Sequence, residues 1–400
     1  MIIGIIGKAN VGKSTFFNAA TELAVPSANY PFTTIEPNVG VGYARVKCAC
    51  REFGVQDNPV HSMCIDGNRF IPVKLIDVAG LVPGAHAGKG LGNKFLDDAR
   101  QADALVHVVD ASGSTDSAGK PVPAGTGDPM FDVRFVEEEF DLWMSGIVMR
   151  DWSKTAREAE NQGQKLEQML AKRLSGLAIP DHLISATVHE SGLGLKKPTM
   201  WSEDDIKKFC HMLRVKAKPF VVVANKADLP SADANIVKMK QAGLEVVPCA
   251  SEAEAMLKKA SKKGIVHYLP GDGSFDVRPG VALNEQQKKA LEIVKGLMDR
   301  YGSTGVQEAI NIACFKLLKL IAVYPVEDEF RLADKKGNVL PDVRLLPQGS
   351  TAKDLAGTVH ADLAKGFLYA VDARTKQRIG ADHHLKDGDV IKIVSAASRG

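Results

Sequence analysis

A glycine-rich loop close to the first residue constrains the fold of this chain more than any other feature. Residues 7–14 read G-K-A-N-V-G-K-S, which satisfies the pattern G-x-x-x-x-G-K-[ST], and they follow the apolar run at residues 2–6. That run is typical of a buried strand, and the loop must then turn into a helix with its backbone N–H groups facing outward. The pattern therefore predicts a phosphate-binding loop between a strand and a helix.

Each part of the loop has a chemical role in holding a nucleotide. The Lys13 ammonium can reach the β- and γ-phosphates, the Ser14 hydroxyl can ligate Mg²⁺, and the helix dipole adds positive potential. A chance glycine turn is the alternative, and the correctly spaced lysine and hydroxyl argue against it. The residues predicted to bind the nucleotide here are Asn10, Val11, Gly12, Lys13, Ser14 and Thr15.

A second motif, N-K-A-D at residues 225–228, indicates which base is bound. It ends the β-branched run at residues 220–224. An Asp228 carboxylate can accept both N1–H and the exocyclic amine of guanine, and adenine offers no such pair of donors. Asn and Asp also cap ordinary helices, but after a phosphate loop the motif predicts GTP. The predicted base contacts are Asn225, Lys226 and Asp228, with a backbone N–H from Ala250 or Ser251.

A third motif, D-V-A-G at residues 77–80, follows another apolar run. Asp77 is expected in the second shell of the magnesium, and the Gly80 N–H is expected to meet the γ-phosphate. Upstream, Thr34 can complete the magnesium shell when GTP is bound, with Thr33 as the alternative. A Thr-Thr pair is otherwise a simple turn or strand element. These segments are the predicted sensors of the third phosphate.

The group that activates the attacking water is not evident from the sequence. Ras-type enzymes carry glutamine directly after D-x-x-G, whereas this chain has Leu81, and leucine cannot polarise water. We therefore expect slow intrinsic hydrolysis. Lys13 and Gly80 would contact the reacting phosphate, and further help would come from backbone, a partner, a cation or His86 in the glycine-rich segment 84–92. The alternative for His86 is a solvated or packing residue.

Three stretches together resemble the Obg-like GTPases, and most closely their YchF branch. They are N-V-G-K-S-T at residues 10–15, F-T-T-I-E-P-N at 32–38 and D-V-A-G-L-V-P-G-A-H-A-G-K-G-L-G-N at 77–93. Residues 346–356 and 388–391 resemble a TGS domain, a ubiquitin-like β-grasp module. The resemblance covers essentially the whole chain, and TGS modules accompany RNA-related functions in other proteins.

The resemblance has two further implications for the nucleotide site. GTPases with Asn-x-Gly-Lys-[ST] often hold K⁺ with the asparagine oxygen, which makes Asn10 a candidate potassium ligand; simple loop geometry is the alternative. Many YchF proteins carry a degraded base motif and favour ATP. Here the motif is intact, so the residues favour GTP and leave an ATP-handling scaffold or ATPase as the alternative.

The order of apolar runs and motifs predicts an α/β fold with separate parts. We expect a P-loop GTPase domain over residues 1–112 and 217–319, with a mostly parallel sheet and helices on both faces. Residues 113–216 would form an inserted, coiled-coil-like helical hairpin, entered through the linker 111–129, because apolar residues recur at helical spacing. Residues 320–400 would form the TGS domain. The helical spacing is carried by Val136, Phe140, Trp143 and Ile147 and by Leu166, Leu170, Leu174 and Leu177.

Composition and cysteine usage narrow the class of protein. A chain of 400 residues with 45% hydrophobic residues and a net charge of +3 is an ordinary globular composition, and no apolar run is long enough for a membrane span. We expect a cytoplasmic monomer. Cys48, Cys50, His61 and Cys64 have the residue types of a zinc site, but a plain hairpin accounts for their spacing, and we expect buried or free thiols rather than zinc.

The sequence therefore favours a GTPase switch that hydrolyses GTP with Mg²⁺ and binds the ribosome or another RNA assembly. A metabolic phosphotransferase is the competing class, and it would need an acceptor pocket and lid arginines. Basic residues of the insertion are candidate RNA contacts, with a solvated helix face as the alternative; these are Arg150, Lys154, Arg157, Lys165, Lys172 and Arg173. Arg374, Lys376 and Arg378 would share one face if their segment is extended.

Overall fold

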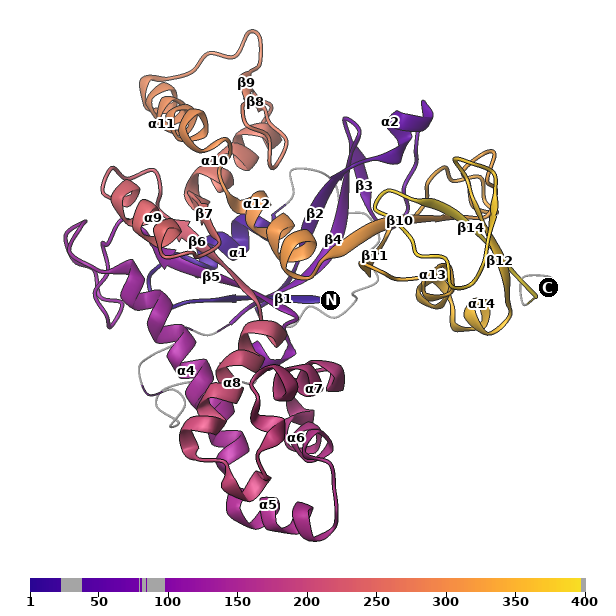
Figure 1. Ribbon diagram of the computed structural model, residues 1–400. Coiled ribbons are helices and arrows are strands. Elements are labelled where there is room, and N and C mark those ends of the chain that lie inside the picture. Colours follow the sequence, from indigo (N-terminus) through magenta and orange to yellow (C-terminus); the bar gives the residue numbers. More distant parts are fainter. Residues whose placement is uncertain (23–37, 79, 81–83, 85–97, 397–400) are drawn as a thin grey trace. The chain divides into compact units, whose positions relative to one another are not determined.

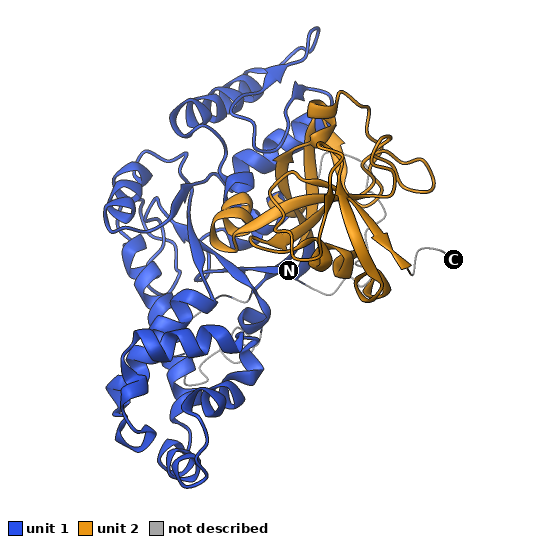
Figure 2. Ribbon diagram, turned by 45° about the vertical axis from the view of Figure 1, so that its right-hand side comes forward, with its two compact units in different colours: residues 1–19, 38–40, 74–309 blue, residues 20–37, 41–73, 310–400 orange. Residues whose placement is uncertain are grey.

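The structure divides into two units, and the first is built around a sheet of parallel strands. The computed structural model describes residues 1–22, 38–78, 80, 84 and 98–396. The chain divides into two units, residues 1–19, 38–40 and 74–309 (unit 1) and residues 20–37, 41–73 and 310–400 (unit 2) (Figure 2). Each unit is described separately.

Unit 1 contains a parallel sheet in the strand order β4-β1-β5-β6-β7. Its strands are short and rich in β-branched residues, and all residues of β5 are buried, as expected where helices cover both faces. The predicted α/β fold is confirmed. The strands are β1 (Ile2–Ile6), β4 (Asn68–Asp77, in unit 1 from Lys74), β5 (Ala104–Asp110), β6 (Phe220–Asn225) and β7 (Val246–Pro248), with a separate pair β8 (Val266–His267) and β9 (Asp276–Val277).

Helices flank these strands in unit 1 (Figure 1). One hydrophobic cluster joins β5, β6 and β7 to the helices that follow them. Helix α11 begins at a capping box formed by Asn284 and Gln287 and is followed by Gly302 at φ 82°, an arrangement that satisfies the free backbone groups at its ends. The helices are α1 (Lys13–Thr21), α9 (Ala232–Gln241), α10 (Ser251–Lys262), α11 (Glu285–Tyr301) and α12 (Val306–Asn311).

The insertion in unit 1 contains more helices than the predicted two-helix hairpin. Residues 129–217, all of them described, form five α-helices around their own hydrophobic cluster. Helices α4 and α8 pack side by side, α6 contacts α4, and α7 contacts both α6 and α8 (Figure 1). Leucine spacing alone did not show where the helices break. They are α4 (Pro129–Met149), α5 (Trp152–Asn161), α6 (Leu166–Leu174), α7 (Asp181–Glu190) and α8 (Glu203–Ala217).

Unit 2 contains a five-stranded mixed sheet in the order β11-β10-β14-β12-β13. Helix α13 packs against it through Ala352 and Leu355, which lie in the same hydrophobic cluster as β10 and β14; the predicted β-grasp architecture is confirmed. Its elements are β10 (Leu320–Val326), β11 (Arg344–Pro347), α13 (Ala352–Val359), α14 (Ala361–Lys365), β12 (Phe367–Asp372), β13 (Arg378–Ile379) and β14 (Val390–Ser395), preceded by a π-helical turn at Ile312–Leu317.

The remaining part of unit 2 is a strand-rich corner. Strand β3 (Met63–Ile65) forms an antiparallel hairpin with the first half of β4, and the short helix α2 (Ala49–Phe53) follows β2 (Val39–Lys47). Gly54 ends α2 in the left-handed region at φ 62°. Among the described residues of both units, no helix is both long enough and apolar enough to cross a bilayer.

Candidate nucleotide site

The phosphate loop lies where β1 ends and α1 begins, as its sequence pattern predicts. Gly7 and Gly12 adopt φ values of 144° and 95°, in the region that side chains rarely enter. A Cβ atom at Gly7 would lie 2.3 Å from the Val108 carbonyl oxygen, and one at Gly12 would lie 2.3 Å from the Asn225 amide nitrogen. Both glycines are therefore required by backbone conformation and by close approach.

Three side chains and a glycine converge at the expected magnesium and γ-phosphate positions. The Ser14 hydroxyl donates to Asp77 Oδ2 at 3.0 Å. Lys13 Nζ donates to the Lys8 carbonyl at 2.6 Å, and a Cβ at Gly80 would lie 3.3 Å from that ammonium. Burial lowers the pKa of Lys13 and raises the pKa of Asp77. A hydroxyl beside a carboxylate is a pair of oxygen donors of the kind that Mg²⁺ and its water ligands use.

Asn225 connects three segments that are predicted to bind the nucleotide. Its Nδ2 donates to the Val11 carbonyl at 2.9 Å, and its Oδ1 accepts from Ser251 N at 3.1 Å and from Ser251 Oγ at 2.9 Å. Only 4% of Asn225 is exposed. The N–H of Ala250 donates to the Thr304 carbonyl, so both backbone donors predicted to meet guanine O6 have partners within the protein.

The other two base-motif residues differ in their surroundings. Asp228 is exposed at the start of the segment after β6. Lys226 Nζ donates to Asp110 Oδ2 at 2.9 Å and to Ser114 Oγ at 3.0 Å. Burial would raise the pKa of Asp110, but hydrogen bonds from Ser112, Lys226 and Ser114 outweigh it and the pKa is lowered. Lys226 is thus fixed beside β5 while the Asp228 carboxylate stays accessible.

The segment that was expected to be only a linker lies against the phosphate loop. Asn10 Nδ2 donates to the Gly119 carbonyl at 2.9 Å, and a Cβ at Gly119 would lie 2.7 Å from the Ala9 carbonyl oxygen. The amide nitrogen of Asn10 is therefore used within the protein, and its carboxamide oxygen is the atom that a potassium ion would need.

Two buried acids of α4 contact the nucleotide loops, and the sequence reasoning missed both. Lys8, the second loop residue, is 3% exposed and donates to Asp132 Oδ1 at 2.8 Å and to the Asp116 carbonyl at 2.6 Å. Glu139 accepts from the Gly84 N–H at 2.6 Å. A spacing of seven residues places Asp132 and Glu139 on one side of the helix. Acids on an otherwise apolar face were the available sequence clue.

Several predicted residues lie outside the described part of the chain. These are the magnesium ligand candidates Thr33 and Thr34, the residue Leu81 and the catalytic candidate His86. Val11 is buried in the loop, while Thr15 is half-buried in the first turn of α1.

Three of the four residues that the sequence suggested as a zinc set lie together in the structure. All six cysteines are free, and Cys48, Cys50 and Cys64 lie together. His61 does not join them, because its Nδ1 pairs with Asp342 at 2.8 Å; Asp57 takes that place.

The basic residues proposed for RNA fall into two groups. Arg150, Lys154, Arg157, Lys165 and Lys172 are exposed on the insertion. Arg173 instead donates to the Ile147 carbonyl and to Thr155 within the helices. In unit 2, residues 373–375 form a turn rather than an extended strand. The condition for a shared face of Arg374, Lys376 and Arg378 is therefore not met, and Arg374 pairs with Glu52.

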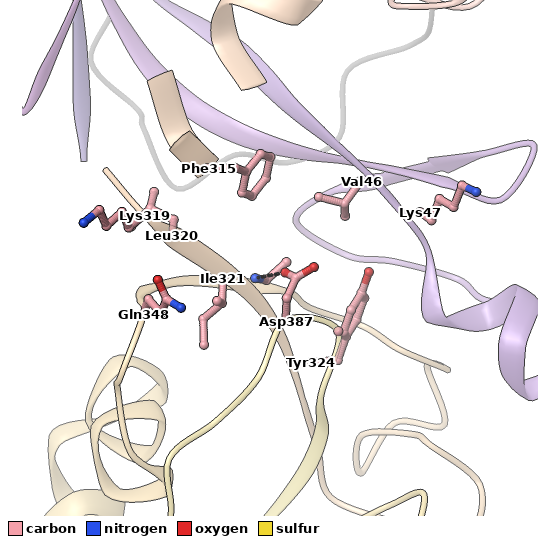
Figure 3. Close-up of a pocket in the computed structure, with 11 residues that line it drawn as sticks. Val46, Lys47, Phe315, Lys319, Leu320, Ile321, Tyr324, Gln348 and Asp387 are labelled. Carbon is pink, nitrogen blue, oxygen red and sulfur yellow. Dashed lines mark hydrogen bonds between the residues drawn. The ribbon is translucent and has the colours of Figure 1, made fainter. Parts of the chain in front are cut away.

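Unit 2 also has a pocket of about 560 Å³ (Figure 3). Phe315, Ile321 and Tyr324 form apolar walls, and Asp387 accepts from the Ala322 N–H at 2.8 Å. None of the residues predicted to bind nucleotide lines it.

Comparisons with known proteins agree with these motifs. Residues 2–124 match the 50S ribosome-binding GTPases, residues 223–328 match the G4-motif domain of Obg-like, YGR210-like GTPases, and residues 335–395 match the TGS domain. A GTP-binding protein of Methanocaldococcus jannaschii is 49% identical over 99% of each chain. The ribosome-binding ATPase YchF of Mycoplasma pneumoniae is 34% identical over 91% of this chain and 87% of its own.

A solved structure extends the similarity to three dimensions. The GTP-binding protein from Pyrococcus horikoshii OT3 is 42% identical, covers 99% of this chain and 100% of its own, and superposes with a TM-score of 0.80. Motifs, folds and relatives agree over nearly the whole chain. The protein belongs to the YchF branch of the Obg-like GTPase family.

Proposed function

We propose that this protein binds GTP with Mg²⁺, hydrolyses it to GDP and phosphate, and changes its interactions with the nucleotide state. The observation that carries the proposal is the bridge by Asn225, which joins the phosphate loop to the 250–251 loop and leaves Asp228 exposed beside them. Ser14 would ligate the metal together with Thr34 or Thr33, and Asp77 would hold its water ligands.

The choice of guanine rests on the intact base motif. Relatives are named both as GTP-binding proteins and as ATPases, so their names support either base. The Asp228 carboxylate favours a base that presents two adjacent donors, which guanine does and adenine does not. The alternative is an ATPase or an ATP-gated scaffold of the same family.

Equilibrium binding of GTP, ATP and XTP to the wild type and Asp228→Asn tests this choice. We expect wild type to prefer GTP over ATP about 100-fold, which corresponds to about 3 kcal/mol for a charged, bidentate contact. Asp228→Asn should bind GTP more weakly and XTP more tightly than wild type, because an amide can accept from N1–H and donate to the xanthine 2-carbonyl. The matched control Asp276→Asn removes an exposed carboxylate of β9 and should change nothing. Tight ATP binding that is insensitive to Asp228 would overturn the guanine assignment.

Hydrolysis would proceed slowly without an added factor. Leucine at position 81 cannot orient water, and the cation held by the Asn10 oxygen would supply part of the missing positive charge near the phosphates. A faster rate in KCl than in NaCl, lost in Asn10→Ala, is expected. Equal rates of GTP hydrolysis in KCl and NaCl would contradict a role for potassium in hydrolysis.

The α4 contacts support a route from the nucleotide to the insertion. Asp132 reaches the phosphate loop through Lys8, and Glu139 reaches Gly84, beyond the D-x-x-G motif. A displacement of either loop on hydrolysis would therefore act on the first helix of the inserted domain, which we place at residues 113–216 between the two parts of the GTPase domain, 1–112 and 217–319; residues 320–400 would form the TGS domain.

We further propose the ribosome or another RNA assembly as partner, with the protein acting as a cytoplasmic monomer. The named functions of relatives and the five exposed basic residues of the insertion support this. Co-sedimentation with ribosomes should be stronger with a non-hydrolysable GTP analogue than with GDP, or the reverse. Ribosome binding that is the same with the GTP analogue and with GDP would count against a nucleotide-dependent switch.

A further inference from the structure

Four potential metal ligands meet in the corner of unit 2 formed by α2 and the β3–β4 hairpin. The ligand atoms of Cys48, Cys50, Asp57 and Cys64 all lie within 4.8 Å of one another. Cys48 immediately precedes α2, Cys50 lies in its first turn, Asp57 lies in the following loop and Cys64 lies on β3. Three of the four residues are buried, and Cys64 is half-buried. Helix α2, the loop after it and β3 thus bring three thiols and a carboxylate to one point.

The spacing of these atoms fits a tetrahedral ion. Cys50 Sγ and Cys64 Sγ are 3.7 Å apart, and two thiolates bound tetrahedrally at a Zn–S distance of about 2.3 Å would be about 3.75 Å apart. Cys48 Sγ and Asp57 Oδ2 are 3.2 Å apart, close to the separation of a sulfur and an oxygen ligand of the same ion. These two separations match a tetrahedral ion, and the remaining pairs of ligand atoms lie within 4.8 Å.

Buried Arg69 shows that this corner is built to hold anions. Arg69 is fully buried; it donates to Cys48 Sγ at 3.4 Å and to Asp57 Oδ2 at 2.8 Å. One guanidinium therefore contacts both a cysteine sulfur and a carboxylate oxygen of the cluster.

We propose that Cys48, Cys50, Asp57 and Cys64 bind a structural Zn²⁺. The ion would displace the thiol protons of its three cysteine ligands as it binds, and Arg69 would donate to the bound Cys48 sulfur and Asp57 oxygen, as partners of metal ligands do. Arg69 also donates to the Leu340 carbonyl at 3.0 Å. The site would therefore hold α2, β3 and the loop before β11 together within unit 2. His61 is not a ligand.

Metal analysis of the purified full chain tests the site directly. We expect one zinc per chain in the wild type and a large loss in Cys50→Ser and Cys64→Ser. Cys210→Ser and Cys249→Ser change buried cysteines elsewhere and should keep the zinc. Asp57→Ala should weaken binding, and Asp57→Cys, which replaces oxygen by sulfur, should retain it.

Cobalt provides a readout that needs no variant. Co²⁺ added to the reduced, metal-free wild type should give the visible absorption of a tetrahedral site and a thiolate charge-transfer band, both displaced by Zn²⁺. Absence of these bands, together with no zinc in the purified protein, would overturn the proposal. So would a count of four free thiols in the denatured protein, because the missing pair would be a disulfide.

Discussion

His107 is a buried histidine in the middle of β5, and neither ring nitrogen has a hydrogen-bond partner among the described residues. Its ring packs edge-on against Phe220 at a centroid distance of 5.9 Å. Burial, and secondarily the charge of Lys13, lower the pKa of His107 to about 3. The imidazole of His107 therefore stays neutral in the folded protein over the pH range in which it becomes protonated in the unfolded chain.

This predicts an acid-dependent loss of stability that depends on one residue. Between pH 6.5 and 3 the unfolded state binds a proton at His107 and the folded state does not. The His107 contribution therefore lowers the free energy of unfolding by about 1.4 kcal/mol for each unit by which the pH is lowered. His107→Leu should remove this slope. Urea unfolding of wild type and variant at a series of pH values measures it, with exposed His182→Leu as control. A wild-type-minus-variant difference that does not change with pH would contradict the prediction.

The pair formed by Lys8 and Asp132 concerns how α4 is anchored to the phosphate loop. Burial raises the pKa of Asp132 to about 6, although the Lys8 hydrogen bond opposes the increase. Neither side chain is exposed by more than 4%. A buried pair is weak evidence of net stabilisation, but removing one member leaves the other charge uncompensated.

We predict that Lys8→Met destabilises the protein at pH 7 by about 3–5 kcal/mol. Adding Asp132→Leu should restore part of the loss, since the unpaired carboxylate is then gone; the Thr115 carbonyl still lacks the Lys8 donor, whereas the Asp116 carbonyl keeps its hydrogen bond from the Gly119 N–H. Without its cation the carboxyl has a still higher pKa, so it is neutral at pH 5. The cost of Lys8→Met should therefore be smaller at pH 5 than at pH 7. Chemical unfolding of the single and double variants provides the cycle, and a double variant as unstable as the sum of both singles would show that the pair does not interact.

Elements that are specified by a short, continuous stretch of sequence could be predicted, whereas contacts between residues far apart in the chain could not. The phosphate loop, the base motif and the strands before them are contiguous in sequence, and their geometry follows from strand, glycine turn and helix. Asn225 was predicted as a base contact, but its bridge from Val11 to Ser251 depends on β6 lying beside β5 and β7. Gly119 was assigned to a linker, because nothing in a Gly- and Ser-rich stretch shows that it lies on Ala9. Asp57 was missed as a partner of three cysteines because a carboxylate between a helix and a strand has no distinctive spacing.

For the molecule as a whole, the two proposed ligands belong to different units. The nucleotide loops lie in unit 1, and the cysteine cluster lies in unit 2. A ligand stabilises the structure that it binds, and hydrogen exchange reports that stabilisation segment by segment. Each ligand should therefore have its largest effect in its own unit.

Hydrogen exchange of the full chain with and without Mg²⁺ and GDP, and with and without a zinc chelator, measures this division. Nucleotide should slow exchange most in residues 8–14, 225–228 and 250–252, because their N–H groups or hydrogen-bond partners meet the ligand. Chelation should accelerate exchange most in residues 48–69, where α2 and β3 would lose their common ion. If nucleotide protected residues 48–69 as strongly as the phosphate loop, the two sites would open in one cooperative step, and the division into separately stabilised units would be wrong.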